Sequence, residues 1–137
     1  MAGYSGTPLV QKLGLKAGMR VHFIDAPRGY FEKTLGRTPT VVMMTKLKGP
    51  LDFVQAFCIE RQALADRIGP IFDQLEQDGM LWVSWPKKSA GVTTDLTEDV
   101  VRGIALDYGV VDVKVCAIDD TWSGLKLVRR VKDRKAD

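Results

Sequence analysis

The segment from Asp52 to Ile59 constrains the fold more than any other part of the chain. Its near-continuous apolar run suits a strand covered on both faces, as in the middle of a parallel sheet. From Glu60 onward, apolar residues recur at helical spacing and leave the charges on the opposite side: Leu64, Ile68, Ile71, Phe72 and Leu75. Gly69-Pro70 lies inside this stretch and predicts a kinked or broken helix.

Strand-like and helical segments alternate along the rest of the chain. Thr7-Pro8 and Gly14 bound a short helix over 9–13, with Thr7 as its cap. Another helix begins at Thr97 and ends before Gly109, and a short one is expected over 29–35. The expected strands before 97 lie at 19–24, at 41–45 and, after an Asp78-Gly79 turn, at 80–85.

The last two expected strands, 110–118 and 125–131, are joined by a loop too short for anything but an antiparallel pair. The earlier alternation of strands with helices implies right-handed crossovers and parallel neighbours. We therefore predict a three-layer Rossmann-like α/β domain with about six strands. The sheet is mainly parallel and closes with a C-terminal antiparallel strand pair.

Composition sets limits on the class of protein. With 137 residues, 45% apolar and 27% charged, residues 1–137 suit one globular domain. The start, Met1 to Gly6, lacks the features of a signal peptide, and no apolar run is long enough for a membrane span, so we expect a cytoplasmic protein. Cys58 and Cys116 are expected to be free thiols, and they form no metal-ligand pattern with the one histidine.

The net charge of +3 is too small to imply a nucleic-acid partner. Basic residues are concentrated at the C-terminus, where we expect residues 129–137 to form a frayed, solvated tail. Its cations could touch phosphates: Arg129, Arg130, Lys132, Arg134 and Lys135.

Ligands of open α/β sheets bind outside the carboxyl ends of the parallel strands. Three loops should meet at that edge in this chain: Asp25–Gly29, Pro86–Thr94 and Asp119–Gly124. We expect the functional site among them, beginning with the Trp85–Gly91 segment.

The middle loop carries the most chemistry. Lys87 and Lys88 supply cationic donors, Ser89 and Thr94 supply hydroxyls, and Gly91 permits close backbone approach. The N-terminus of the following helix would add free N–H groups, so the loop suits a phosphate or a carboxylate. No Walker-type glycine-lysine spacing is present. The alternative is a polar crossover loop whose hydroxyls cap the helix and whose lysines are solvated.

The first loop invites comparison with a dinucleotide or S-adenosylmethionine site, because Asp25 ends the first strand. The loop holds a single glycine, Gly29, so the usual glycine-rich turn cannot be written there. The competing interpretation makes Asp25 a strand-end cap or a partner of Arg28.

In the third loop, Trp122 stands beside Ser123 and could stack on a ligand or pack on its own domain. His22 is expected to be a satisfied histidine of the sheet. Asp119 and Asp120 do not suit paired-carboxylate catalysis, because adjacent residues of an extended chain point opposite ways.

Three motifs occur in order along the chain: Gly3–Leu9, Trp85–Lys88 leading to Thr94–Leu96, and Thr121–Leu125. Together they resemble an uncharacterised bacterial family, known only as a domain of unknown function, and the resemblance spans nearly the whole chain. That resemblance implies a bacterial cytoplasmic origin and no established activity. The layout also resembles a shortened class I methyltransferase, in the entries to two strands (Lys16–Val21 and Asp78–Val83) and in the closing strand pair. The chain departs from that pattern in lacking the glycine-rich cofactor turn.

Our leading hypothesis is a non-catalytic or regulatory domain that binds a small anionic ligand or a protein partner at the carboxyl edge. The expected ligand-binding residues are Asp25, Arg28, Lys87, Lys88, Ser89, Gly91, Thr94, Trp122 and Ser123. No catalytic set or metal site is expected, and no cofactor is assigned. The alternatives are a divergent methyltransferase using S-adenosylmethionine and a weak nucleic-acid binder.

Overall fold

The computed structural model describes residues 6–136 of the chain. Residues 1–5, which begin the first of the three family motifs, and Asp137 of the basic tail lie outside the described residues. The elements follow one another as α1 (Leu9–Leu13), β1 (Arg20–Ile24), η1 (Tyr30–Leu35), β2 (Val42–Met43), β3 (Leu51–Phe57), α2 (Arg61–Gln74), β4 (Leu75–Pro86), η2 (Lys88–Ala90), α3 (Glu98–Tyr108), β5 (Val110–Ala117), β6 (Trp122–Arg129) and η3 (Val131–Asp133).

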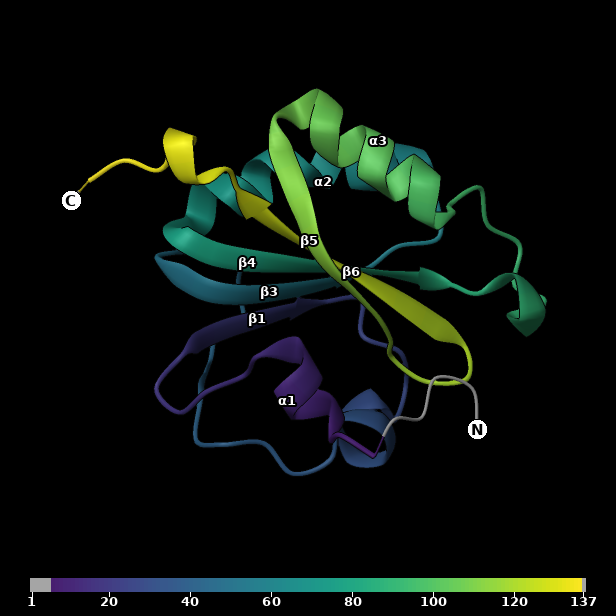
Figure 1. Ribbon diagram of the computed structural model, residues 1–137. Coiled ribbons are helices and arrows are strands. Elements are labelled where there is room, and N and C mark those ends of the chain that lie inside the picture. Colours follow the sequence, from purple (N-terminus) through teal and green to yellow (C-terminus); the bar gives the residue numbers. More distant parts are fainter. Residues whose placement is uncertain (1–5, 137) are drawn as a thin grey trace.

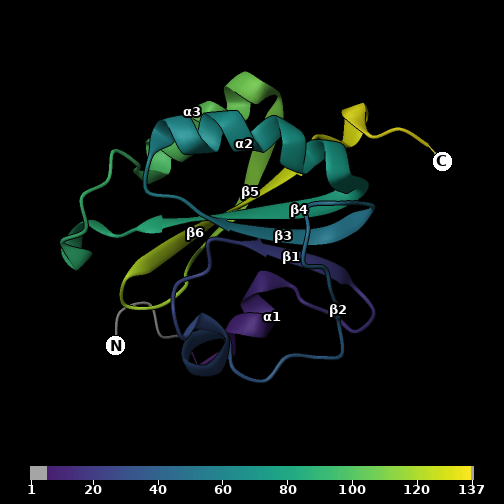
Figure 2. The same ribbon diagram turned by 180° about the vertical axis from the view of Figure 1, so that it is seen from behind.

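The strands form a six-stranded sheet in the order β2-β1-β3-β4-β6-β5. Strands β1, β2, β3 and β4 pair in parallel, while β6 runs antiparallel to both of its neighbours. Helices α2 and α3 cover one face, and α1 with the helical turn η1 covers the other (Figures 1 and 2). The predicted three-layer α/β fold with a closing antiparallel pair is confirmed.

The central strand β3 is buried on both faces, as its apolar run predicts. Val54, Ala56 and Cys58 belong to the core beneath α2 and α3. Phe53 and Phe57, the alternate positions, belong to the core on the α1 side. This two-faced burial fixes the register of β3, because a shift of one residue would exchange the two sets.

The α1-side core also contains a short chain of polar side chains. The Tyr30 hydroxyl donates to Oε1 of Gln55 at 2.6 Å, and Nε2 of Gln55 donates to the Ser84 hydroxyl oxygen at 3.0 Å. Gln55 and Ser84 are fully buried. Burial raises the pKa of the Tyr30 phenol, which therefore stays protonated and remains a donor. The network pairs buried polar groups that would otherwise destabilise the sheet.

Helix α2 runs unbroken from Arg61 to Gln74, so of the two outcomes predicted at Gly69-Pro70 the break is wrong, and the kink stays a prediction. Four apolar residues before and after Pro70 are buried against the sheet: Leu64, Ile68, Ile71 and Phe72. Their packing offsets the hydrogen bond that proline removes. Gly69 allows the ring of Tyr108 on α3 to lie close to the helix backbone.

Strand β4 begins at Leu75, five residues earlier than Met80, where we expected it to start. Leu51 pairs with Leu75 and Phe53 pairs with Met80, so residues near Asp78-Gly79 form a bulge within the strand. The turn-like dipeptide therefore interrupts the pairing without ending the strand. A Cβ on Gly79 would lie 3.1 Å from the carbonyl oxygen of Glu76, which explains the need for glycine.

Strand β6 begins at Trp122, so Trp122 and Ser123 belong to the strand and not to the loop in which we placed them. Asp119 shortens the loop by accepting hydrogen bonds from the backbone N–H groups of Thr121 and Trp122, each at 2.8 Å. A smaller correction concerns α1, whose N-cap is Pro8, with no capping side chain, where Thr7 was expected.

The basic C-terminal tail begins after Arg129, and several of its residues form hydrogen bonds or ion pairs with the rest of the chain or with one another. Arg129 belongs to β6, and its guanidinium donates to the carbonyls of Phe72, near the end of α2, and of Glu76, at the start of β4. Arg130 pairs with Asp133 at 2.7 Å, and the backbone N–H of Lys135 donates to Gln77. Arg129 therefore belongs to the sheet and not to the expected tail, and fraying of the residues after it stays a prediction.

Cys58 and Cys116 are both free. Of the helices in the described part of the chain, none is long and apolar enough to cross a membrane.

Two glycines offer a matched test of the packing. Gly49 lies against the end of α2, where an added Cβ would come within 3 Å of the Gln74 carbonyl oxygen. Gly103 lies within α3 with open space around it. Gly49→Ala should lower the free energy of unfolding by about 1–3 kcal/mol through overpacking. Gly103→Ala should raise it by about 0.5–1 kcal/mol through helix propensity. Urea denaturation of the two variants measures both changes, and equal effects would contradict this packing.

Candidate functional site

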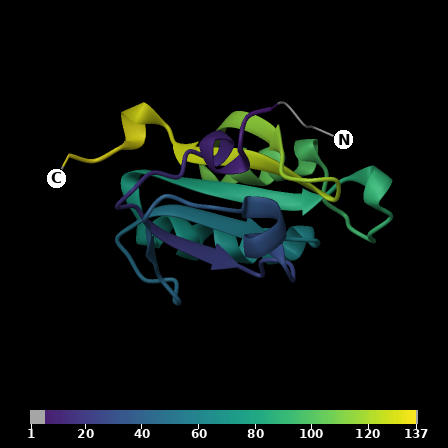
Figure 3. The same ribbon diagram turned by 90° about the horizontal axis from the view of Figure 1, so that it is seen from below.

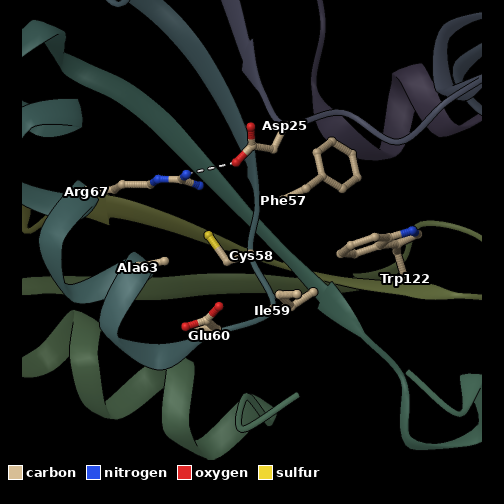
Figure 4. A pocket seen from close by; sticks show the side chains of 8 residues that line it. All are labelled: Asp25, Phe57, Cys58, Ile59, Glu60, Ala63, Arg67 and Trp122. Atoms are coloured by element: carbon tan, nitrogen blue, oxygen red, sulfur yellow. Dashed lines mark ion pairs between the residues drawn. The ribbon is translucent and has the colours of Figure 1, made fainter. Parts of the chain in front are cut away.

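The carboxyl ends of β1, β3, β4 and β5 lie along one edge of the sheet (Figure 1). A pocket of about 270 Å³ opens at this edge (Figure 4). It is lined by residues that follow β1, end β3 or begin α2, and by the first residue of β6: Asp25, Phe57, Cys58, Ile59, Glu60, Ala63, Arg67 and Trp122. The general rule for open sheets therefore locates this pocket.

Asp25 directly follows β1 and has a positive φ of 57°, a conformation that few residues other than glycine adopt. Its carboxylate pairs with the guanidinium of Arg67 on α2 at 2.8 Å. Arg28, which one of the sequence interpretations made the partner of Asp25, is exposed and lies outside the pocket lining. The left-handed turn aims Asp25 across the edge toward α2 and away from its own loop.

The Cys58 thiol points toward the ion pair (Figure 4). Burial raises the pKa of this thiol, while the charge and hydrogen bonding of Arg67 oppose the rise. Burial alone would lower the pKa of Arg67, but the hydrogen bond and charge of Asp25, with a contribution from Cys58, raise it. Next to the neutral thiol of Cys58, the pocket therefore holds a guanidinium and a carboxylate that are paired with each other.

Aromatic rings form the other side of the pocket. The rings of Phe57 and Trp122 meet edge to face, with centroids 5.1 Å apart. Tyr30 supports Phe57 from behind in a second edge-to-face contact, with centroids 4.9 Å apart. Trp122 stays partly exposed, so it both packs on its own domain and presents a ring surface to the pocket.

The Pro86–Thr94 loop, which we call the lysine loop, lies at a different, smaller pocket of about 210 Å³. Lys87, Lys88 and Ser123 line it together with Thr97 and Glu98 at the start of α3. The Thr97 hydroxyl oxygen already accepts a hydrogen bond from the N–H of Val100, and Glu98 brings a negative charge. The helix end therefore offers an anion less than the sequence suggested.

Strand geometry explains why the expected residues divide between two pockets. Trp122 and Ser123 are neighbours in β6, and successive side chains of a strand point to opposite faces. Trp122 accordingly packs on the α1 side, while Ser123 lines the pocket beside α3.

The remaining expected residues, Arg28, Ser89, Gly91 and Thr94, line neither pocket. The Thr94 hydroxyl donates to the carbonyl of Ile59 at 2.5 Å and accepts from the N–H of Leu96. It holds the lysine loop against the turn between β3 and α2. Ser89 and Gly91 are exposed.

Sequence reasoning missed Cys58, Glu60 and Arg67. The rule that located the other loops could have found Cys58 and Glu60, because the end of β3 reaches the same edge. Arg67 lies almost two turns inside α2, and only the three-dimensional packing shows that it reaches Asp25.

His22 behaves as expected of a sheet histidine, with Nδ1 lying 2.8 Å from the carbonyl oxygen of Met44. Within residues 6–136 there is no group of three or more histidine, cysteine, aspartate or glutamate side chains arranged to hold a metal ion.

No protein-family model matches the sequence, and no curated protein matches it either. Solved structures do match it in fold. A methyltransferase of Aquifex aeolicus that depends on S-adenosylmethionine is 13% identical with a TM-score of 0.58, over 87% of this chain and 86% of the other.

Two further matches were solved with S-adenosylhomocysteine bound. The magnesium protoporphyrin IX methyltransferase of Synechocystis is 13% identical with a TM-score of 0.56, covering 89% of this chain and 78% of the enzyme. The 1,6-didemethyltoxoflavin-N1-methyltransferase of Burkholderia thailandensis is 15% identical with a TM-score of 0.58, covering 94% and 75%. At these identities the likeness is one of fold alone. The chain has the α/β fold of the class I methyltransferases that depend on S-adenosylmethionine.

Proposed function

We propose that this chain is a binding domain for a small charged ligand, which occupies the carboxyl-edge pocket between Asp25, Arg67 and Trp122. The main support for this proposal is the pocket itself, in which the Asp25–Arg67 ion pair lies opposite the partly exposed ring of Trp122. Ligand pockets of α/β sheets combine apolar walls with a few placed charges in this way.

The charges of the pocket refine the kind of ligand. Asp25 and Glu60 contribute two carboxylates, and Arg67 contributes one guanidinium. A purely anionic ligand would gain from Arg67 and be repelled by both acids. A ligand that carries both signs can place its anionic group at Arg67 and its cationic group at Asp25 or Glu60. We therefore narrow the anionic ligand expected from the sequence to a zwitterion.

A binding role fits the pocket better than catalysis. The raised pKa of Cys58 leaves the thiol neutral, and a neutral thiol is a poor nucleophile. Asp25 is already engaged in an ion pair with Arg67, so its carboxylate is not a free group facing the pocket. An open pocket at this edge also favours a small ligand over a protein partner.

The second candidate is a methyltransferase that uses S-adenosylmethionine, a molecule that carries both signs of charge. Its support is the fold shared with enzymes solved with S-adenosylhomocysteine bound. The turn after β1 weighs against it, since Asp25 to Gly29 contains proline and one glycine where close backbone approach is needed. The family of unknown function and the cytoplasmic location stay predictions.

The weak nucleic-acid alternative loses part of its support. Two of its cations are engaged within the chain: Arg129 donates to the carbonyls of Phe72 and Glu76, and Arg130 pairs with Asp133. Lys87, Lys88 and the other cations of the C-terminal tail remain as its basis.

Arg67→Gln tests the proposed site. A thermal-shift panel of amino acids, nucleotides, organic phosphates and dicarboxylates should contain a stabilising zwitterion, because binding to the folded state raises its stability. Arg67→Gln should lower the affinity for that ligand about 10- to 100-fold, since hydrogen bonds to charged groups contribute about 1.5–3 kcal/mol. Without ligand, the variant should lose only about 0–1 kcal/mol, because the ion pair is partly exposed.

Lys87→Ala combined with Lys88→Ala is the matched control, because it removes positive charge at the neighbouring pocket. It should leave the ligand affinity unchanged. Loss of binding in this control but not in Arg67→Gln would move the ligand to the lysine loop. A panel without any stabilising compound would reject the ligand proposal.

Isothermal titration calorimetry decides the methyltransferase alternative. If this alternative holds, binding of S-adenosylmethionine and of its demethylated product to the protein should each produce measurable heat. Asp25→Asn should lower the affinity for both compounds. The asparagine tolerates the left-handed backbone while removing the carboxylate charge. No measurable heat from wild-type protein at high concentration would exclude this activity.

A further inference from the structure

Four lysines gather on the α1 side of the sheet, away from the carboxyl-edge pocket. Lys12 and Lys16 come from α1 and the segment after it, and Lys114 and Lys126 come from β5 and β6. Seen from below the sheet, α1 lies in front of β6 (Figure 3). We call these four residues the lysine patch.

A bulge in β5 creates the central pair of the lysine patch. Asp112 pairs with Leu127 and Lys114 pairs with Lys126, so Val113 is the extra residue. Without the bulge, Val113 would stand opposite Lys126, and Lys114 would point to the α3 side. The extra residue thus turns Lys114 toward α1 and places two ammonium-bearing side chains directly across from each other.

The arrangement is electrostatically unfavourable without a counter-charge. Like charges directly opposite on neighbouring strands destabilise a sheet. Burial lowers the pKa of Lys126, and the charges of Lys114 and Lys16 lower it further. Burial raises the pKa of Cys116, while the nearby charges of Lys12 and Lys114 act to lower it.

The nearest acid along β5 does not neutralise the lysine patch. Asp112 precedes the bulge and pairs with Arg102 of α3 at 2.9 Å, on the opposite face of the sheet. Across residues 6–136, none of the ion pairs includes Lys16, Lys114 or Lys126. The Lys114 ammonium donates to the carbonyl of Lys12 at 3.0 Å, which uses one of its three protons.

We propose that the lysine patch binds a compact, multiply phosphorylated anion, as a site separate from the carboxyl-edge pocket. Ammonium groups act as point charges toward phosphate oxygens. Three of them, from Lys16, Lys114 and Lys126, gather around one strand pair and suit a short chain of phosphates. An extended nucleic-acid strand would need a longer basic track and rings for its bases to stack on.

Inorganic tripolyphosphate is the probe, titrated calorimetrically at low salt. It should bind wild-type protein, and Lys16→Gln combined with Lys126→Gln should weaken it about tenfold or more, because fewer cations oppose the phosphates. Lys46→Gln combined with Lys48→Gln is the charge-matched control. Both control residues follow β2, at the other edge of the sheet from β5, and their loss should change the affinity less than twofold.

The unliganded variant supplies a second readout. Lys126→Gln alone should raise the melting temperature by about 1–3 °C, because it relieves repulsion with Lys114. A lower melting temperature would mean that Lys126 serves the fold, and it would overturn the proposal. Absence of tripolyphosphate binding, or equal weakening in the control, would overturn it as well. Binding of a single-stranded oligonucleotide but not of tripolyphosphate would replace the compact anion with nucleic acid. None of these outcomes depends on Arg67, so they leave the proposed function to its own test.

Discussion

The indole of Trp82 holds the α1 layer on the sheet, and much of the molecule depends on that contact. The side chain is fully buried in β4, and its Nε1 donates to the carbonyl of Leu13 at the end of α1, at 2.9 Å. Gly124 on β6 gives the ring its space, because a Cβ there would lie 3.2 Å from it. A five-residue helix has little stability of its own, so this bond and the burial of Leu13 keep it in place. The positions of Lys12 and Lys16 follow from it.

The sequence predicted the fold better than the site. Hydrophobic period and capping residues identify most elements because they report local geometry, as with the apolar run of β3 and with Thr97 and Gly109 around α3. The misplaced starts of β4 and β6 have a common cause. Asp78-Gly79 and Trp122-Ser123-Gly124 look like turns locally, but pairing with neighbouring strands continues through them. Long-range hydrogen bonding of this kind leaves no periodic trace in the sequence.

The site was predicted only in part for a related reason. Asp25 and Trp122 meet at the expected edge because strand ends converge there, whatever the ligand. Arg67 could not be foreseen, since its role depends on how α2 lies across the sheet. In the loop richest in polar residues, the hydroxyl of Thr94 holds the structure together, as does that of Thr97 just beyond the loop. Polar side chains in a loop thus show that hydrogen bonds can form there. The fold decides whether these side chains bind other residues of the chain or remain available to a ligand.

The two edges of the sheet carry a consequence for behaviour in a crowded solution. An exposed edge strand can recruit strands from other molecules and so start aggregation. At one edge, β2 has only two residues and offers little to pair with. At the other, β5 exposes Val113 and Val115, and the irregular residue at Val113 breaks the row of backbone groups that an incoming strand would need. Both edge strands therefore resist pairing with a further strand, β2 because it is short and β5 because of its bulge. The sheet stays at six strands although apolar side chains remain exposed at its edges.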